Sequence, residues 1–263
     1  MNNFHLTILG ARGSIPVSGP DFVRYGGNSS CYALMEGSTA VAFIDAGTGL
    51  AAYRSYGVEL APTVDIFLTH YHWDHIQGLS MLDELWRGAC DVQVWGPDDP
   101  EAVLASAIAP PVFPVSIHEA NVRFTKTHGS VTIGDLTITP FHLHHPQGGC
   151  GYRVDGPRRS VAIVADHEAG TDVDAVIRDA IAGIDVLIHD AQYLPSEVES
   201  HRGWGHSTYA DAISLARDVG ASELVLTSHD PNRTDRAIDS MMSEVRMSFE
   251  GALAAAQGLE VSL

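Results

Sequence analysis

Residues 64–75, VDIFLTHYHWDH, join an apolar run to a dense group of ionisable side chains. The first five of these residues are rich in β-branched and aromatic types, which predicts a buried strand. If the strand geometry continues, His70 and His72 point to the same side, because side chains alternate with period two. Asp74 and His75 then fall in the turn before a helix. Three imidazoles and a carboxylate at the end of a strand indicate a metal site more strongly than a surface turn of solvated histidines.

Length and composition favour one α/β domain. A chain of 263 residues with 45% hydrophobic content can bury one large core, and strand and helix patterns alternate along residues 1–263. No segment has a secretory signal pattern or approaches the roughly 18 apolar residues of a membrane-spanning helix. We therefore expect a cytoplasmic protein without membrane association. Cys31, Cys90 and Cys150 are widely spaced, which predicts buried thiols rather than a disulfide framework.

The formal net charge of −18 argues against extensive nucleic-acid binding. Such binding needs a face of Lys and Arg that neutralises phosphates, and the chain has 15 basic residues against 33 acidic ones. A small anionic substrate remains compatible with this charge, because two bound metal dications can reverse the field within a site.

Strand and helix patterns recur along the whole chain. Strands are expected at residues 4–9, 31–35, 40–44, 64–68, 92–95, 131–139, 151–154, 160–164, 184–188 and 223–227. Helices are expected at residues 76–86, 97–109, 173–181, 208–219 and 235–257, with a glycine-rich loop over residues 10–27.

Other ionisable residues also follow predicted strands. These residues are His145, Asp166, His189, Asp190 and His229. Because the carboxyl ends of neighbouring parallel strands meet at one edge of a sheet, this recurrence is a second argument for a site. Asp45 follows the strand at residues 40–44, where it is either a support for a metal ligand or a helix cap.

Residues 69–78, THYHWDHIQG, resemble the signature of the metallo-β-lactamase superfamily. The later motifs occur in the order found in its ribonuclease Z and cyclic-phosphate phosphodiesterase branch. They are His145 with Gly151-Tyr152-Arg153, Ala165-Asp166, Ile188-His189-Asp190-Ala191, Gly205-His206-Ser207-Thr208 and Ser228-His229-Asp230. The similarity covers nearly the whole chain.

The resemblance implies a four-layer αββα sandwich, an α/β fold, with two divalent metal ions at one edge of its sheets. The ions would be zinc, with manganese as the alternative. His70, His72 and His145 would hold the first ion, Asp74, His75 and His229 the second, and Asp166 would bridge them. His145 is preferred to His142 and His144 because Tyr152 is seven positions after it, as in that branch.

The residue types support this assignment. Neutral imidazoles with a few carboxylates suit Zn²⁺ or Mn²⁺, and a water shared by two such ions loses a proton near neutral pH and can attack phosphorus. His206, oriented by Asp190, is a candidate to protonate the leaving group or to stabilise charge in the transition state. Its alternative role is a helix-start residue beside a cap. Asp74, His206 and Asp190 are thus the candidate catalytic residues.

The expected activity is hydrolysis of a small or cyclic phosphodiester by a metal-bridging hydroxide. The alternatives are hydrolysis of carboxylic esters, lactones or thioesters, and transfer-RNA processing. Enzymes of this branch that process transfer RNA carry a long RNA-binding arm between the third His ligand and the bridging Asp. Here Asp166 is only 21 positions after His145, and this interval is too short for the arm. Relatives in the branch also imply a homodimer.

Overall fold

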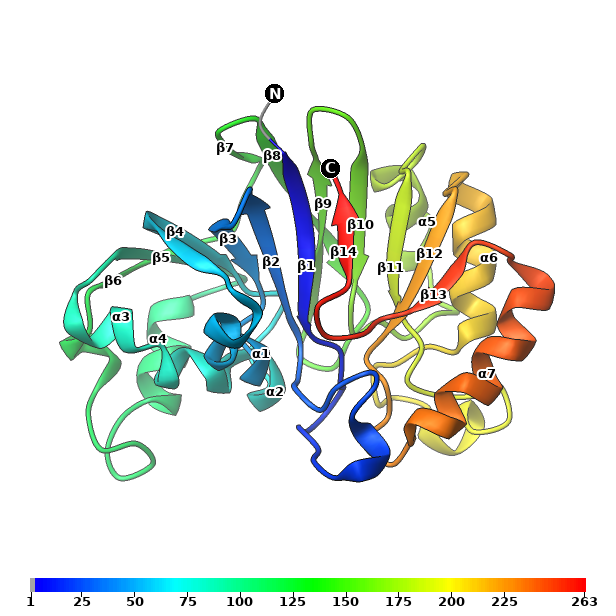
Figure 1. Ribbon diagram of the computed structural model, residues 1–263, viewed down its shortest axis with the longest axis horizontal. Coiled ribbons are helices and arrows are strands. Elements are labelled where there is room, and N and C mark those ends of the chain that lie inside the picture. Colours follow the sequence, from blue (N-terminus) through cyan, green and yellow to red (C-terminus); the bar gives the residue numbers. More distant parts are fainter. Residues whose placement is uncertain (1–2) are drawn as a thin grey trace.

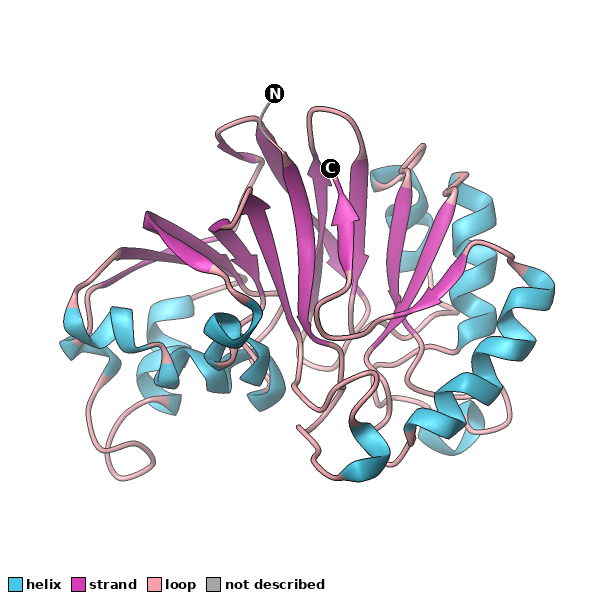
Figure 2. Ribbon diagram, viewed as in Figure 1, coloured by secondary structure: helices cyan, strands magenta, loops and turns pink. Residues whose placement is uncertain are grey.

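Two β-sheets pack face to face, and helices cover their outer faces (Figures 1 and 2). The computed structural model describes residues 3–263. The layers therefore follow the order helices, sheet, sheet, helices, which confirms the predicted αββα sandwich. Within residues 3–263, no helix has both the length and the apolar character that a membrane crossing needs.

The first sheet has the strand order β14-β1-β2-β3-β4-β5-β6. Its strands are β1 (Phe4–Gly10), β2 (Cys31–Glu36), β3 (Thr39–Ile44), β4 (Glu59–Phe67), β5 (Asp91–Gly96), β6 (Val122–Lys126) and β14 (Glu260–Ser262). Pairing is antiparallel from β14 to β3 and parallel from β3 to β6.

The second sheet repeats this arrangement with the order β7-β8-β9-β10-β11-β12-β13. Its strands are β7 (Val131–Ile133), β8 (Leu136–Leu143), β9 (Gly149–Asp155), β10 (Ser160–Val164), β11 (Val186–Asp190), β12 (Glu223–Thr227) and β13 (Ala252–Ala254). Pairing is again antiparallel for the first four strands and parallel from β10 to β13. Each half of the chain thus builds one sheet of the same design.

The helices divide between the two outer faces. Those beside the first sheet are α1 (Thr48–Ala51), α2 (Trp73–Ile76), α3 (Asp83–Arg87) and α4 (Pro100–Ala107), and those beside the second are α5 (Val173–Ala180), α6 (Tyr209–Val219) and α7 (Asp235–Ser248) (Figure 1). Local sequence explains the limits of α6. A capping box of Thr208 and Asp211 begins the helix, and Gly220 ends it in the left-handed conformation.

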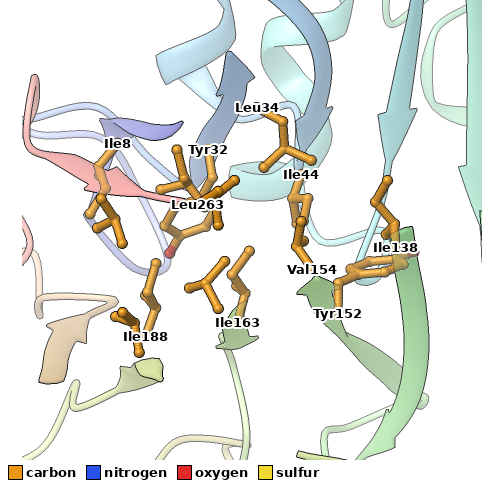
Figure 3. Close-up of a cluster of buried hydrophobic side chains, with 14 of the residues drawn as sticks. Ile8, Tyr32, Leu34, Ile44, Ile138, Tyr152, Val154, Ile163, Ile188 and Leu263 are labelled. Atoms are coloured by element: carbon orange, nitrogen blue, oxygen red, sulfur yellow. The ribbon is translucent and has the colours of Figure 1, made fainter. Parts of the chain in front are cut away.

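Three apolar layers hold these elements together. The central layer lies between the sheets and includes Ile8, Tyr32, Leu34, Ile44, Ile138, Tyr152, Val154, Ile163, Ile188 and Leu263 (Figure 3). Two further clusters lie between each sheet and its helices. Strands such as β11 are buried on both faces, which is why they are almost continuously apolar.

Some predicted boundaries were wrong. The predicted helix at residues 76–86 is divided into α2, a 3-10 segment at Gln77–Met81, and α3. The segment at 131–139 is a hairpin that turns at Gly134, and the predicted helix at 235–257 ends at Ser248 before β13. Strands β6 and β14, both at sheet edges, were not predicted.

Candidate metal centre and catalytic pair

The site residues come from the ends of strands in both sheets. Residues 69–75 follow β4, while Asp166 and Asp190 lie at the ends of β10 and β11. Asp45 follows β3, and His145 follows β8. Parallel strands present their carboxyl ends at the same edge, so residues far apart in sequence meet there. In Figure 1 these loops lie at the lower edge of the two sheets.

His70, His72 and His145 form the first group of possible metal ligands. One ring nitrogen from each lies within 4.8 Å of the others. Nε2 of His145 is 3.1 Å from Nδ1 of His72. Nε2 of His70 is buried and has no hydrogen-bond partner among the described residues. A buried imidazole nitrogen without a partner costs free energy, so this atom fits a role as a metal ligand.

A second group combines His70, His75 and Asp166, again with one donor atom from each within 4.8 Å of the others. Nε2 of His75 lies 3.1 Å from Oδ2 of Asp166 and 3.3 Å from Oδ2 of Asp74. Asp74 also accepts a hydrogen bond of 2.8 Å from the backbone N–H of Ser14. Asp166 therefore stands between the imidazoles of the first group and the side chains of His75 and Asp74, as a bridging ligand must.

Asp45 supports this arrangement from behind. Its carboxylate is fully buried and accepts a hydrogen bond of 2.7 Å from Nδ1 of His75. It also accepts hydrogen bonds from the N–H and hydroxyl of Thr69 and from the hydroxyl of Ser30. With Nδ1 engaged, Nε2 of His75 faces Asp74 and Asp166. The structure thus places Asp45 behind a ligand, in the supporting position proposed for it.

Three candidate ligands have protonation states that suit cation binding. Burial lowers the pKa of His70 well below its ordinary value, and burial also lowers the pKa of His145 to about 4. Both rings are therefore neutral near pH 7 and keep a lone pair for a metal. Burial alone would raise the pKa of Asp166, but His75 and His206 hold it well below its ordinary value. Asp166 is thus a carboxylate.

His206 and Asp190 form a pair at the same cavity. Nδ1 of His206 lies 2.7 Å from Oδ2 of Asp190, and both side chains are buried. Burial alone would lower the pKa of His206, but the carboxylates of Asp190 and Asp166 raise it to about 9. The ring is protonated at neutral pH, and it lines the cavity that also contains His72, His145 and Asp166. The predicted pairing of His206 with Asp190 is therefore present.

The family comparison agrees with this geometry. A model of the "Beta-lactamase superfamily domain" matches residues 42–229. This chain belongs to the metallo-β-lactamase superfamily. It is a metal-dependent hydrolase of that fold, and its buried His and Asp clusters are consistent with a dinuclear metal site.

This metallo-β-lactamase-fold protein is similar to ribonuclease Z and to a protein of the PhnP family. An uncharacterized protein of Mycobacterium bovis is 29% identical over 94% of this chain and 87% of its own. Ribonuclease Z of Haloarcula marismortui is 25% identical over 97% of this chain and 95% of its own. A diphosphatase of the PhnP family has a TM-score of 0.73 and 20% identity, covering 99% of this chain and 97% of its own. This last likeness concerns the fold.

The structure does not bring the predicted ligand His229 into either group of possible ligands, although its Nδ1 is buried and has no hydrogen-bond partner among the described residues. Nε2 of His229 is 2.9 Å from the carbonyl oxygen of Ala255, and its ring packs edge-on against Tyr25. Ser228 faces the site instead, where its hydroxyl donates to Oδ1 of Asp166 at 3.1 Å. Strand β12 ends at Thr227, and Ser228 has a left-handed backbone with a φ of 55°, which turns its hydroxyl toward Asp166. At the end of β12, the superfamily protein thus presents the hydroxyl of Ser228, rather than the ring of His229, to Asp166.

The remaining histidines near the site take other partners. Nδ1 of His144 lies 3.2 Å from the carbonyl oxygen of Glu168, and Nε2 of His167 lies 3.1 Å from Asp174. His142 is exposed. Of the three histidines in this segment, the structure therefore brings only His145 to the first group of ligands.

Strained backbone marks the same region. Six described residues other than glycine have positive φ, and five of them belong to the site or its walls: Ser14, Asp45, Gln147, Asp166 and Ser228. Residues with a Cβ adopt this conformation rarely and at a cost, and they concentrate at functional sites. The strain at Asp45 and Asp166 is offset by the hydrogen bonds that both carboxylates accept. Sequence reasoning missed Ser14, Gln147 and Ser228.

Proposed function

We propose that this protein hydrolyses small phosphodiesters with two divalent metal ions. The observation that carries the proposal is the position of His206, whose Nδ1 is held by Asp190 in the cavity that contains the metal-ligand groups. A phosphodiester leaves an alkoxide, which needs a proton, whereas the thiolate released from a thioester does not. A general acid in this position therefore favours phosphodiesters over thioesters.

His70, His72, His145, Asp166, Asp74 and His75 would hold the ions. When bound, the ions supply Lewis acidity toward phosphoryl oxygens and a nucleophile derived from water. Three imidazoles suit Zn²⁺ at the first position, while the carboxylates around His75 suit Zn²⁺ or Mn²⁺ at the second.

The side chains of the protein perform the proton transfers and the positioning. Asp190 holds Nδ1 of His206, which leaves Nε2 for the oxygen of the leaving group. Asp45 fixes the ring of His75, and the carbonyl oxygen of Gly205 accepts from Nδ1 of His145 at 2.9 Å. Fixed rings keep the ligand atoms in one geometry without reorganisation during the reaction.

The walls of the cavity favour a small substrate. The cavity has a volume of about 490 Å³, within the range of small-molecule sites. Residues 149–164 between His145 and Asp166 form β9 and β10 of the sheet, so this segment does not extend as an arm. Together with the net charge of −18, this supports a small diester over transfer RNA.

The test is a substrate panel with metal-reconstituted protein. We expect turnover of bis(p-nitrophenyl) phosphate that disappears on chelation and in Asp74→Ala, and little turnover of lactones or thioesters. His118→Ala is the matched control, since His118 is an exposed histidine that lies outside the cavity. A preference for lactones or thioesters, or no diester turnover by loaded protein, would overturn the proposal.

A further inference from the structure

Two exposed tryptophans line the metal cavity. The side chain of Trp73 is 56% exposed and that of Trp204 is 62% exposed, although tryptophan is usually largely buried. Both line the cavity that contains His72, His145 and His206. Large aromatic side chains kept in water beside a polar site mark a binding surface.

The loop that carries Trp204 is held in place on both sides. The carboxylate of Glu168 accepts hydrogen bonds from the backbone N–H of Gly203 at 2.8 Å and of Gly205 at 2.9 Å. Both glycines have positive φ, of 82° and 85°, which a side chain would disfavour. The ring of His201 packs edge-on against Trp204, with ring centroids 5.2 Å apart. Trp204 is therefore exposed on an ordered loop.

Trp73 is held by its position in the chain. It is the first residue of α2 and lies between His72, of the first ligand group, and Asp74, beside the second. A residue between two such anchored neighbours has little backbone freedom. The two tryptophans thus come from opposite halves of the sequence and reach one cavity at fixed positions.

We infer that Trp73 and Trp204 bind the nucleobase of the substrate, so that the diester is a small nucleoside-bearing phosphodiester. This inference rests on the proposed phosphodiesterase function and names its substrate class. Aromatic side chains stack on any base because every base has a π-face. The ligand groups in the cavity provide for the phosphate, and the tryptophans for the planar ring.

The test compares two diesters with the same leaving group. Thymidine p-nitrophenyl phosphate carries a nucleoside, and methyl p-nitrophenyl phosphate does not. We expect metal-loaded protein to prefer the thymidine diester, and the ratio of the two kcat/KM values to fall about ten-fold to a hundred-fold in Trp73→Ala or Trp204→Ala. Trp73→Phe and Trp204→Phe should each retain most of the wild-type ratio of the two kcat/KM values. Met247→Ala, on the exposed face of α7, is the control and should leave the ratio unchanged.

A binding measurement separates this inference from the proposed function. Adenosine monophosphate should quench the tryptophan fluorescence of metal-loaded protein, ribose phosphate should not, and Trp204→Ala should weaken the binding of adenosine monophosphate at least ten-fold. Binding of this kind without diester turnover would refute the phosphodiesterase proposal and retain nucleobase recognition. Equal kcat/KM values for both diesters, or equal binding of both monophosphates, would overturn the nucleobase inference even with a working phosphodiesterase.

Discussion

Oδ2 of Asp45 lies 2.7 Å from Nδ1 of His75, and neither side chain is accessible to solvent. Asp45 itself has a φ of 61°, an unfavourable conformation that Thr69 and Ser30 stabilise by donating to its carboxylate. Burial alone would lower the pKa of His75, but the carboxylates of Asp45, Asp74 and Asp166 raise it well above its ordinary value in the metal-free protein. When a cation displaces the proton on Nε2, Asp45 keeps the tautomer that is protonated on Nδ1. We therefore expect metal affinity to depend on Asp45, which is not itself a candidate ligand.

Asp45→Asn should lower the affinity for metal about ten-fold to a hundred-fold, because an amide holds the ring of His75 less firmly in this tautomer. Competition with a chromogenic chelator measures this affinity. Asp135→Asn, at an exposed acid outside the site, is the control. An unchanged chelator midpoint in Asp45→Asn would show that His75 is oriented by other contacts.

His206→Ala should reduce kcat about a hundred-fold to ten-thousand-fold for diesters with alkoxide leaving groups, because the general acid is lost. The reduction should be smaller for p-nitrophenolate, which leaves without protonation. Asp190→Asn should also reduce kcat, and again more strongly for diesters with alkoxide leaving groups. Equal losses for both types of leaving group in steady-state assays would argue that His206 positions the substrate instead.

The pH dependence of stability follows from the pKa of His206. In metal-free protein this pKa is about 9, above the ordinary 6.5, so folding favours the protonated ring. The stabilisation is complete below pH 6.5, declines between pH 6.5 and 9, and is lost at higher pH. Urea unfolding of wild type and Asp190→Asn should therefore differ most below pH 6.5 and converge toward pH 9. A difference that grows with pH would contradict the assignment.

Ser228→His should increase metal retention. The second position has one imidazole, from His75, together with the carboxylates of Asp74 and Asp166, so wild type should lose part of its second ion on gel filtration. Mass spectrometry of the metal should then find close to two equivalents per chain in Ser228→His and fewer in wild type. Circular dichroism checks that the buried substitution is tolerated. If wild type retained two metal equivalents per chain, the absence of an imidazole at position 228 would not limit metal binding.

Much of the centre was predictable because its signals are local. Residues 70–75 and Asp166 follow apolar strands, and the ends of parallel strands meet at one edge. The hydrogen bond from Ser228 to Asp166 was not predictable, since it depends on the left-handed backbone of Ser228 just after β12. The exposure of Trp204 could not be predicted from the sequence either, because it depends on a loop that is held by the distant carboxylate of Glu168.

The division of the predicted helix at residues 76–86 has a tertiary cause. A Cβ on Gly78 would lie 2.0 Å from the carbonyl oxygen of Gly47, and one on Gly47 would lie 2.2 Å from that of Asp74. The two backbones therefore pack in direct contact, and the chain leaves the regular helix there. Apolar periodicity contains no information about such a contact. The short edge strands β6 and β14 also depend on neighbours distant in sequence.

Gly205 limits which substitutions the protein can accept beside its metal centre. Its N–H is held by Glu168, its carbonyl oxygen is bonded to the ring of His145, and its neighbour is Trp204. A Cβ at this position would lie 2.1 Å from Nδ1 of His145. When substrate preference changes among relatives, we therefore expect Trp204 to be replaced and Gly205 to be conserved. Substrate selectivity can then change without loss of metal binding.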